Sequence, residues 1–372
     1  MPAGSTTPAF LERTRDARKI VVIDYGFLGD SVHLVPALWE LKRHYAKAEI
    51  HTLSAPVGAE LLTMAPCVDK AWAFPLGAKK VPWWKHWDIL LALRRQRFDV
   101  AFNFTGSDRS IFTTAFMEAT SSLGYEAGRR HFWNHWLVRD WVLRTERNLP
   151  VFEQRRQVLA ARGFSLEPPR FDLRVPDEAR QWARQAVQDN AVHLAINAST
   201  PVKEWPLEHW IELAKALLAA DGKLCLAATA SANPREQERL AALAKGVNDK
   251  RLVCLAGPSL ARLAAILERC RLQIGGDSGV LHLAMALGVP TLTVFREHVG
   301  LKEWMPVGTQ HRHFIAECPC LKENRDDCLT AGKSACLGSI SVDLVVKAAL
   351  LQLPVIILAP GAHPSHTRPE HD

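Results

Sequence analysis

The sequence predicts an α/β protein of two domains, each with a mostly parallel sheet covered by helices. Its 372 residues exceed what one hydrophobic core usually serves, since a domain holds roughly 150 residues. In both halves, short apolar, β-branched runs alternate with segments of helical periodicity, which is typical of parallel sheets with helical connections. From Gly163 to Pro176 the chain becomes Pro-rich and loses its periodicity, as expected of an interdomain connection.

We therefore divide the chain into four parts. The first domain is expected at residues 1–168, a linker at 169–190, the second domain at 191–345, and a C-terminal segment with a disordered tail at 346–372. Two α/β domains of similar size form a cleft between the carboxyl ends of their sheets, where ligands of open α/β folds bind. A two-substrate enzyme suits such a cleft.

The first half begins with a strand, a glycine turn and a helix. Lys19 to Asp24 is a buried strand by its apolar, β-branched character, and the turn Tyr25 to Asp30 follows it. From Ser31 onward the spacing of apolar residues predicts a helix; these residues are Leu34, Leu38, Leu41 and Tyr45. Further strands are predicted at Glu49 to Leu53 and Phe98 to Phe104.

The second half repeats this alternation. Four strands are predicted, at Val192 to Ala198, Lys223 to Ala228, Leu252 to Ala256 and Leu272 to Gly275. Helices are predicted between them, at Leu207 to Ala220 and Leu260 to Arg269.

Charge and composition narrow the function. Apolar residues make up 48% of the chain and charged residues 23%, which is ordinary for a globular enzyme and excludes a fibrous or disordered chain. The 46 Lys and Arg against 39 Asp and Glu give a net charge of +7, which suits a protein that handles phosphates or rests on an anionic membrane. We find no basic helix with interleaved aromatic residues, so we do not expect nucleic-acid binding.

Neither end of the chain predicts a membrane span or a secretion signal. The first 19 residues lack an apolar segment, and Ala348 to Ala359 is too short and is interrupted by Gln352 and Pro354. We expect a cytoplasmic protein. Pro360 to Asp372 is expected to be a disordered tail.

Asp30 is the first candidate for chemistry. It lies in the segment Gly29 to His33, where the first strand meets its helix, so its carboxylate would point into the cleft and act as a general base. A helix-capping role for Asp30 explains the same position, and both interpretations stay open. We expect His33 to be a hydrogen-bonded core or wall residue and not a catalyst.

The segment Asn197 to Pro206 is the second candidate. It follows the first strand of the second half and carries small hydroxyl residues and Lys203. Hydroxyls donate to phosphate oxygens and an ammonium supplies a point charge, so this loop can neutralise a departing diphosphate without a metal. A turn with a solvated lysine is the alternative.

The third candidate is the glycine-rich turn Gly275 to Gly279 before a helix that contains His282. Backbone N–H groups at a helix start form an anion site, and glycine lets phosphate approach the main chain. Asp277 can orient the turn or hold a sugar hydroxyl. A plain tight connection explains the same pattern, which lacks the features of a P-loop or a dinucleotide fingerprint.

Together, in this order, these segments resemble glycosyltransferase family 9, the ADP-heptose:lipopolysaccharide heptosyltransferases. The similarity is strongest at Gly29 to His33 with Pro36 to Leu38, at Lys203 to Pro206, and at Gly276 to Gly279 with His282. Weaker support comes from Arg97 to Val100, Leu255 to Gly257 and Pro290 to Phe295.

The resemblance implies a GT-B architecture of two Rossmann-like domains, an inverting reaction and no metal requirement for catalysis. It implies that the N-terminal domain binds the acceptor and the C-terminal domain the nucleotide sugar, with Asp30 as the catalytic base. The donor and phosphate positions of the family correspond to Ser199, Thr200, Lys203, Asp277, Ser278, Gly279 and His282. Glu236, expected in a loop after the strand near Cys225, would contact the ribose. The short segment between Thr200 and Lys203 leaves open which hydroxyl meets which phosphate.

The function that the resemblance implies is heptose transfer from ADP-heptose to an inner-core acceptor, either Kdo or heptose. The expected partners are an ADP-sugar and a lipid-linked or core oligosaccharide, met at the inner face of the cytoplasmic membrane by a peripheral protein. Another nucleotide sugar, a protein acceptor, a catalytically inactive binding module and a nucleotide-sugar epimerase are the alternatives. The Trp-rich, basic region Val81 to Arg97 either contacts an anionic lipid-linked sugar or membrane, or is a surface helix.

Four cysteines are close together in the sequence, at Cys318, Cys320, Cys328 and Cys336. Four thiolates can hold a structural zinc or iron ion away from the catalytic site, although zinc ligands are usually two to four residues apart, more than the single residue between the first pair. Unliganded thiols are the alternative. The other cysteines are expected in the core, at Cys67, Cys225, Cys254 and Cys270.

Overall fold

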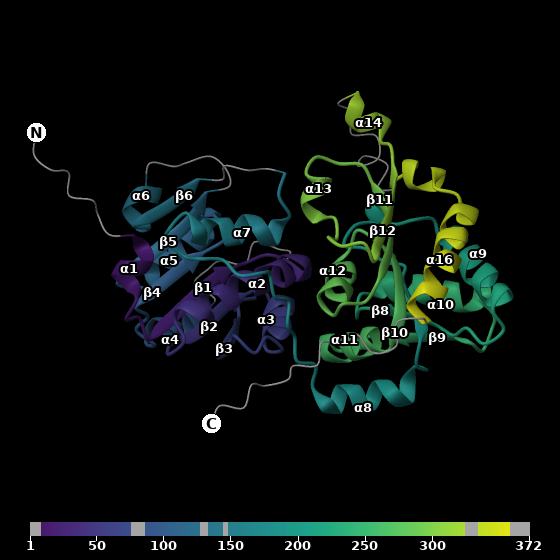
Figure 1. Cartoon of the computed structure of the whole chain (residues 1–372), viewed down its shortest axis with the longest axis horizontal. Coiled ribbons are helices and arrows are strands. Elements are labelled where there is room, and N and C mark those ends of the chain that lie inside the picture. Colours follow the sequence, from purple (N-terminus) through teal and green to yellow (C-terminus); the bar gives the residue numbers. More distant parts are fainter. Residues whose placement is uncertain (1–8, 76–85, 127–132, 144–147, 324–333, 358–372) are drawn as a thin grey trace, which may run out of the picture.

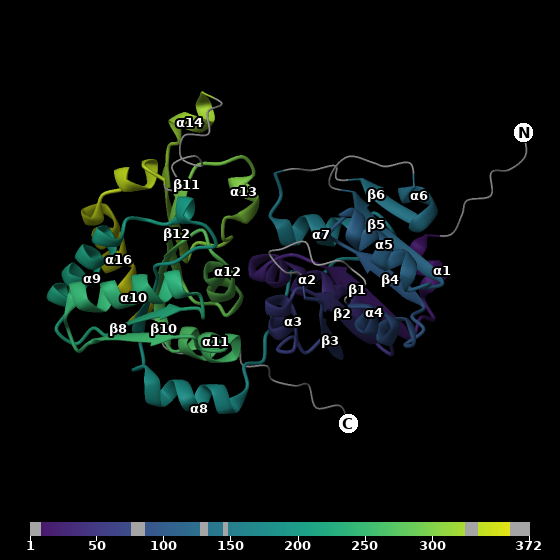
Figure 2. The ribbon, with the colours of Figure 1, turned by 180° about the vertical axis from the view of Figure 1, so that it is seen from behind.

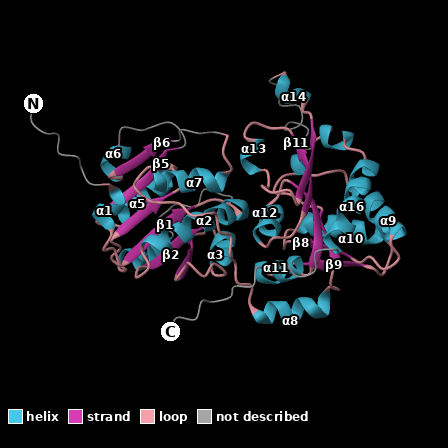
Figure 3. Ribbon diagram, viewed as in Figure 1, coloured by secondary structure: helices cyan, strands magenta, loops and turns pink. Residues whose placement is uncertain are grey.

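The computed structural model describes residues 9–75, 86–126, 133–143, 148–323 and 334–357, arranged as two α/β domains side by side (Figure 1). Each domain contains a six-stranded sheet in which every pair of neighbouring strands is parallel. Figure 3 shows helices on both faces of the sheets. The predicted α/β class is therefore confirmed.

The N-terminal domain alternates strands and helices over its whole length. Its strands are β1 (Lys19–Asp24), β2 (Glu49–Ser54), β3 (Lys70–Ala73), β4 (Val100–Asn103), β5 (Ser121–Glu126) and β6 (Asp140–Leu143). Its helices are α1 (Phe10–Thr14), α2 (Leu28–His44), α3 (Pro56–Leu62), α4 (Trp87–Arg94), α5 (Asp108–Phe116), α6 (Asn134–Leu137) and α7 (Val151–Ala160).

The C-terminal domain follows after α8 (Asp177–Ala186), which lies within the predicted linker. Its strands are β7 (Ala191–Ala195), β8 (Leu226–Ala230), β9 (Leu252–Ala256), β10 (Cys270–Gly276), β11 (Thr291–Arg296) and β12 (His311–Ala316). Its helices are α9 (Leu207–Ala220), α10 (Pro234–Val247), α11 (Leu260–Glu268), α12 (Gly279–Ala286), α13 (Leu301–Trp304), α14 (Pro319–Lys322) and α16 (Val342–Ile357), with 3-10 turns η2 (Pro201–Lys203) and η3 (Cys336–Ser339).

The two sheets have the same strand order. In the first it is β3-β2-β1-β4-β5-β6, and in the second β9-β8-β7-β10-β11-β12. In both, the order reverses beside the first strand of the domain, between β1 and β4 and between β7 and β10. Such a reversal opens a crevice at the carboxyl ends of the strands, which is where open α/β sheets bind ligands. All three candidate segments follow strands at these two points.

Alternating side chains of each strand supply the cores on the two faces of the sheet. In β1, Ile20 and Val22 pack with α1, α2 and α7, whereas Val21 and Ile23 pack with α4. In the second domain, α9, α10 and α16 contribute to one buried cluster and α8, α11 and α12 to another. The period of two explains this division, because successive side chains of a strand point to opposite faces.

The domains also share a buried apolar cluster. Val32, Leu61 and Met64 of the first domain belong to the same cluster as residues of α11 and α12. In both views α2 and α3 face α11 and α12 across the interface (Figures 1 and 2). Burial of these side chains favours association of the domains by roughly 25 cal/mol per Å² of apolar surface removed from water.

Most predicted elements have the expected type, and their ends differ by a few residues. The strand Leu252–Ala256 and the helix Leu207–Ala220 match the predicted bounds. Helix α2 begins at Leu28, before Asp30, and β7 ends at Ala195 rather than Ala198. Among the described helices, none has the length and apolar character needed to cross a bilayer. The predicted disordered tail and part of the Trp-rich region, residues 81–85, lie outside the described residues.

Candidate active site at the interdomain cleft

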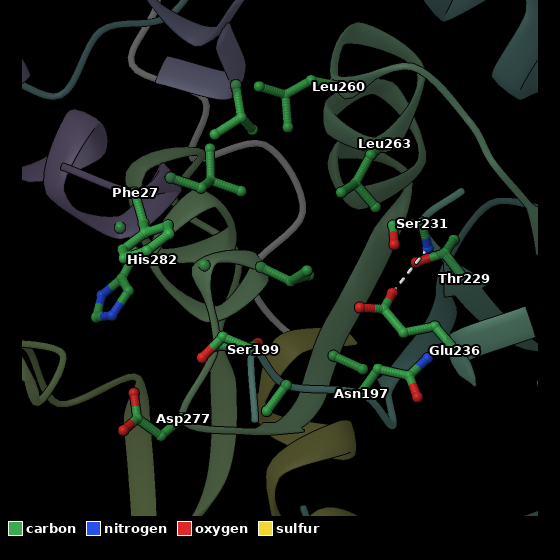
Figure 4. A pocket seen from close by; sticks show the side chains of 18 of the residues that line it. Phe27, Asn197, Ser199, Thr229, Ser231, Glu236, Leu260, Leu263, Asp277 and His282 are labelled. Carbon is green, nitrogen blue, oxygen red and sulfur yellow. Dashed lines mark hydrogen bonds between the residues drawn. The ribbon is translucent and has the colours of Figure 1, made fainter. Parts of the chain in front are cut away.

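A cavity of about 580 Å³ lies between the domains, at the carboxyl ends of the strands where the strand order reverses. The first domain lines it with the start of α2 and with Val57 and Glu60 of α3. The second domain lines it with the segments that follow β7, β8 and β10 and with the starts of α11 and α12 (Figure 4). Each domain therefore presents a different set of side chains to one shared cavity.

Asp30 lies in the first turn of α2 and lines the cavity. Its Oδ2 accepts a hydrogen bond of 2.9 Å from the Phe27 N–H, so it does brace the start of the helix, and 27% of its side chain remains exposed. Burial raises the pKa of Asp30 above its ordinary value, and the neighbouring Arg155 guanidinium limits that rise. The same carboxylate therefore supports the helix start and faces the cavity, and a raised pKa suits a group that accepts a proton.

Lys203 and Asp277 contact each other beyond the carboxyl ends of the neighbouring strands β7 and β10. The Lys203 Nζ lies 2.7 Å from the Asp277 Oδ2, and both side chains line the cavity. His298 Nε2 lies 3.5 Å from the same oxygen. Burial alone would raise the pKa of Asp277, but His298 and Lys203 outweigh it and hold that pKa well below its usual range. Asp277 is thus ionised, and it holds the lysine ammonium at the cavity wall.

The start of α12 provides further polar groups. The helix begins at Gly279, directly after Ser278, so its free N–H groups lie at the cavity wall. Ser278 Oγ is buried and has no hydrogen-bond partner in the described structure. A buried hydroxyl without a partner costs free energy, which an incoming acceptor atom such as a phosphate oxygen would recover.

The loop after β7 divides the two predicted hydroxyls. Both residues are exposed, but Ser199 lines the cavity and Thr200 is not among the described residues of its wall. Of the two hydroxyls predicted to contact phosphate, the structure therefore places only that of Ser199 at the cavity. Buried Glu204 fixes this loop, since it accepts the Ala198 N–H at 3.1 Å and pairs with Arg235 at 2.6 Å.

Glu236 lies in the cavity wall, but not in the loop predicted for it. It belongs to the first turn of α10, because Asn233 caps that helix and Pro234 starts it. Its Oε2 accepts the Ser231 N–H at 2.9 Å (Figure 4). Figure 4 shows Glu236 beside Ser231 and Thr229, on the opposite side of the view from Asp277.

A pair of buried histidines joins the two domains beside the cavity. His33 Nε2 and His282 Nδ1 are 3.0 Å apart, at a distance that fits one hydrogen bond. Burial lowers the pKa of His282 to about 4, and burial together with His282 and Arg155 lowers that of His33 well below its usual range. Both rings are therefore neutral near pH 7. His33 is a buried, hydrogen-bonded residue behind the cavity wall, the core position that we predicted as one alternative, and His282, which lines the cavity, is its partner across the interface.

Two motif glycines allow the helices to approach so closely. A Cβ at Gly29 would lie 2.8 Å from the His282 ring, and a Cβ at Gly279 would lie 2.8 Å from the Cβ of Leu28. Either carbon would force α2 and α12 apart. These glycines are required by space at the domain interface, whereas the sequence suggested only that Gly279 serves phosphate approach.

Three residues of the site were not found by sequence reasoning: Arg155, Asn197 and His298. Arg155 is buried in α7 and touches Asp30, but it lies 125 residues further along the chain in an ordinary helical pattern. Asn197 lines the cavity, and its amide nitrogen is buried without a partner. Asn197 begins the second candidate segment and was the only one of the three with a local signal.

Two of the four cysteines that were predicted in the core are buried there. Cys67 and Cys270 are buried, and Cys225 and Cys254 are half-buried against the core clusters. Of the predicted metal ligands, Cys318 is buried and Cys320 and Cys336 are half-buried, while Cys328 lies outside the described residues. Within the described part of the chain, no group of three His, Cys, Asp or Glu side chains is arranged to hold a metal ion.

Comparison with known proteins agrees with this architecture. The family model for glycosyltransferase family 9 (heptosyltransferase) matches residues 83–333. A lipooligosaccharide heptosyltransferase 2 of Haemophilus ducreyi is 25% identical over 290 residues, which cover 73% of this chain and 81% of that protein. The crystal structure of a family 9 glycosyltransferase from Veillonella parvula superposes with a TM-score of 0.77 at 18% identity, covering 91% of this chain and 98% of that one.

The structure of Escherichia coli ADP-heptose lipopolysaccharide heptosyltransferase II superposes with a TM-score of 0.73 at 18% identity, over 91% of this chain and 99% of that one. These superpositions show the GT-B fold that the resemblance implied. The family match covers more than half of the chain and includes the donor-side segments of the cavity. The chain belongs to glycosyltransferase family 9, the heptosyltransferase family, and is a glycosyltransferase.

Proposed function

We propose that the protein transfers a heptose from ADP-heptose to an inner-core acceptor of lipopolysaccharide, Kdo or heptose, by a single inverting displacement. One observation carries this proposal. The carboxylate of Asp30 and the ammonium of Lys203 come from different domains and line the same cavity. Relatives whose names state heptose transfer to lipopolysaccharide or lipooligosaccharide support the sugar class and the acceptor class.

Asp30 would act as the general base. It accepts the proton of the acceptor hydroxyl while that oxygen bonds to the anomeric carbon of the heptose. The bond between that carbon and the diphosphate breaks at the same time, and ADP leaves with the electron pair. Attack from the side opposite to the diphosphate inverts the anomeric centre, and the position of Asp30 on the domain opposite to Lys203 suits this geometry.

Lys203 would neutralise the diphosphate as it departs. In the described structure its ammonium pairs with Asp277, so the donor phosphates would share it with that carboxylate. Ser199, Ser278 Oγ and the N–H groups at Gly279 would donate further hydrogen bonds to the phosphates. His298 Nε2, like the Lys203 ammonium, lies beside the Asp277 carboxylate. We expect these groups to replace the divalent ion that other glycosyltransferases use, so turnover should survive a chelator.

The nucleoside would occupy the end of the cavity lined by α10 and α11. Glu236 lies there with the apolar side chains Leu260 and Leu263, on the far side from Asp277 in Figure 4. A carboxylate accepts hydrogen bonds from ribose hydroxyls, and apolar walls suit a base. Glu236 is therefore the ribose contact in this proposal, with its bond to Ser231 N–H keeping it in place.

Product identification tests the proposal. The purified full chain would be incubated with ADP-heptose and with a lipid-linked Kdo acceptor, a heptosylated acceptor, or no acceptor, in the presence of EDTA. We expect ADP release with one heptose added to the mass of one acceptor, and no turnover without acceptor. Conversion of the donor alone would support an epimerase, and ADP release with other nucleotide sugars but not with ADP-heptose would reject the donor assignment.

We further propose that the acceptor is met at the inner face of the cytoplasmic membrane. Phe112 of α5 and Trp136 of α6 are large apolar side chains with exposed fractions of 54% and 84%, and α5 also carries exposed Arg109. Aromatic and basic side chains together favour a peripheral contact with anionic lipid. Co-sedimentation with phosphatidylglycerol vesicles, but not with phosphatidylcholine vesicles, is expected, and its loss in Trp136→Ala would identify the surface.

The cysteine cluster is proposed as a structural zinc or iron site remote from the cavity. Cys318, Cys320 and Cys336 are described, and an Arg296 nitrogen donates a hydrogen bond of 3.6 Å to Cys318 Sγ. Metal analysis of the full chain is expected to find one zinc or iron per chain, lost in Cys318→Ser and kept in Cys67→Ser. A metal-free wild-type protein would remove this proposal without affecting the catalytic one.

A further inference from the structure

Arg155 is a buried cation that contacts the proposed base. It lies in α7, which packs against α2, and only 6% of its side chain is exposed. Burying a guanidinium costs several kcal/mol unless carboxylates and hydrogen bonds compensate. The groups that contact Arg155 therefore indicate which interaction compensates the cost of burying its charge.

The Arg155 guanidinium contacts the end of β1 and the start of α2 at once. One terminal nitrogen lies 2.6 Å from Asp24 Oδ2 and 3.6 Å from Asp30 Oδ1. The other donates a hydrogen bond to the backbone carbonyl of Asp30. A planar, forked guanidinium can contact the carboxylate and the backbone carbonyl of one residue at the same time, which a lysine ammonium does less well. Arg155 thus restrains both the backbone and the carboxylate of Asp30.

We infer that Arg155 is a positioning residue for the transfer reaction, which fixes Asp30 where the acceptor hydroxyl arrives and keeps its carboxylate anionic. This inference rests on the proposed function, in which Asp30 is the base. Arg155 does not itself line the cavity among the described residues, so it would act through Asp30 and not on substrate.

The charges around Asp30 explain why its carboxylate needs a cation beside it to stay ionised. Burial raises the pKa of Asp30, Arg155 lowers it and the Asp24 carboxylate raises it. Without Arg155, the charges of Asp24 and Asp30 would act on each other in a largely buried site with no guanidinium paired to either. The pKa of Asp30 would then rise, because a nearby negative charge and burial both disfavour its ionised form. A base that is protonated at working pH cannot accept a proton.

The other titratable groups near Asp30 do not replace Arg155. Burial lowers the pKa values of His33 and His282, so both rings are neutral near pH 7. Glu60 and Lys203 line the same cavity, but Lys203 is paired with Asp277. Within the described structure, Arg155 is therefore the charged side chain that pairs with Asp30, and Asp24 acts on Asp30 through its charge.

The test compares the pH dependence of kcat in Arg155→Met with that of the wild type. Removal of the guanidinium is expected to move the acid limb upward by about one pH unit or more and to lower kcat at neutral pH by about tenfold. The dissociation constant of ADP, measured by calorimetry, should stay within about twofold, since Arg155 is not part of the donor side. Arg155→Lys should restore part of the shift.

Arg156→Met is the matched control. Arg156 is the next residue of the same helix, is equally buried, and pairs with Glu40 at 2.9 Å and Glu153 at 2.5 Å, away from the cavity. It should lower the melting temperature as much as Arg155→Met does and leave the acid limb in place. If Arg155→Met does not fold, the double variant Asp24→Asn with Arg155→Met removes both buried charges. Its acid limb should still lie above that of the wild type, but by less than the shift of about one pH unit expected for Arg155→Met.

The outcomes separate the inference from the proposed function. If Asp30→Asn is inactive and the acid limb of the folded Arg155 variant coincides with that of the wild type, the positioning role is wrong and the base assignment stands. If Asp30→Asn retains wild-type turnover, the base assignment itself fails. A limb that moves in both Arg155→Met and Arg156→Met would mark a general effect of stability and would also overturn the role of Arg155.

Discussion

The two sides of the cleft share one topology and differ in charge. Both sheets have the same strand order, and both present their ligand-facing loops beside the first strand of the domain. On the N-terminal side a carboxylate, Asp30, is supported by a buried arginine. On the C-terminal side an ammonium, Lys203, is supported by a carboxylate, Asp277. The shared fold supplies the position of each charged group, and the residues that follow the first strands decide its sign; in the proposed mechanism the carboxylate takes a proton and the ammonium meets a phosphate.

The largest expected effect separates these two sides. Asp30→Asn keeps the size of the side chain and removes its basicity, so kcat should fall by at least about a hundredfold. ADP binding, measured by calorimetry, should be unchanged if Asp30 belongs to the acceptor side, as we propose. Asp177→Asn, at a side chain that is 98% exposed, is the control and should behave as the wild type. Weaker ADP binding in Asp30→Asn would contradict the division of labour.

Lys203→Met should affect both binding and turnover. In the proposed mechanism the diphosphate would lose its ammonium in the ground state and during departure, so kcat/KM should fall by about a hundredfold and ADP should bind more weakly. Lys215→Met on the exposed face of α9 is the matched control. Unchanged ADP affinity in Lys203→Met would show that the ammonium serves only Asp277.

Gly279→Ala tests the contact between the two sides. The new Cβ would lie 2.8 Å from Leu28 Cβ, which cannot move freely because it belongs to α2. We expect turnover to fall about tenfold through misplacement of the two sides and stability to fall by about 1 to 3 kcal/mol. Gly222→Ala places a Cβ in open space and should change neither quantity. A fully active Gly279→Ala would mean that the close approach is not needed for transfer.

The smallest expected effect distinguishes two neighbouring hydroxyls. Ser199 lines the cavity and Thr200 does not, so Ser199→Ala should weaken ADP binding about fivefold while Thr200→Val leaves it unchanged. Calorimetric titration with ADP is the measurement. Equal losses in both variants would restore the sequence-based prediction that both hydroxyls contact phosphate.

Local patterns in the sequence predicted most of the architecture. The β-branched runs and helical spacing identified β1, β2, β9, α9 and α11 within a residue or two, because each pattern reports on residues that are neighbours in the chain. The end of β7 and the start of α2 were placed less well. At these points the chain leaves the regular element to build the cavity, and periodicity carries no information about the ligand-facing turn.

The motifs likewise located Asp30, Lys203 and Asp277, since each follows a strand and a glycine or small-residue turn marks it. The contact between Lys203 and Asp277 joins residues 74 positions apart, and that between Arg155 and Asp30 joins residues 125 apart. No spacing rule predicts such pairs.

The chain alone was sufficient for the α/β class, the two-domain division and the family resemblance, because periodicity and turn residues are local properties. Only the assembled molecule decided which hydroxyl reaches the cavity, why Gly29 and Gly279 must lack a side chain, and which cation supports Asp30. Those answers depend on distances between α2, α7 and α12, which come together when burial of apolar surface joins the two domains. A buried charge acquires its partner and its pKa only at that stage.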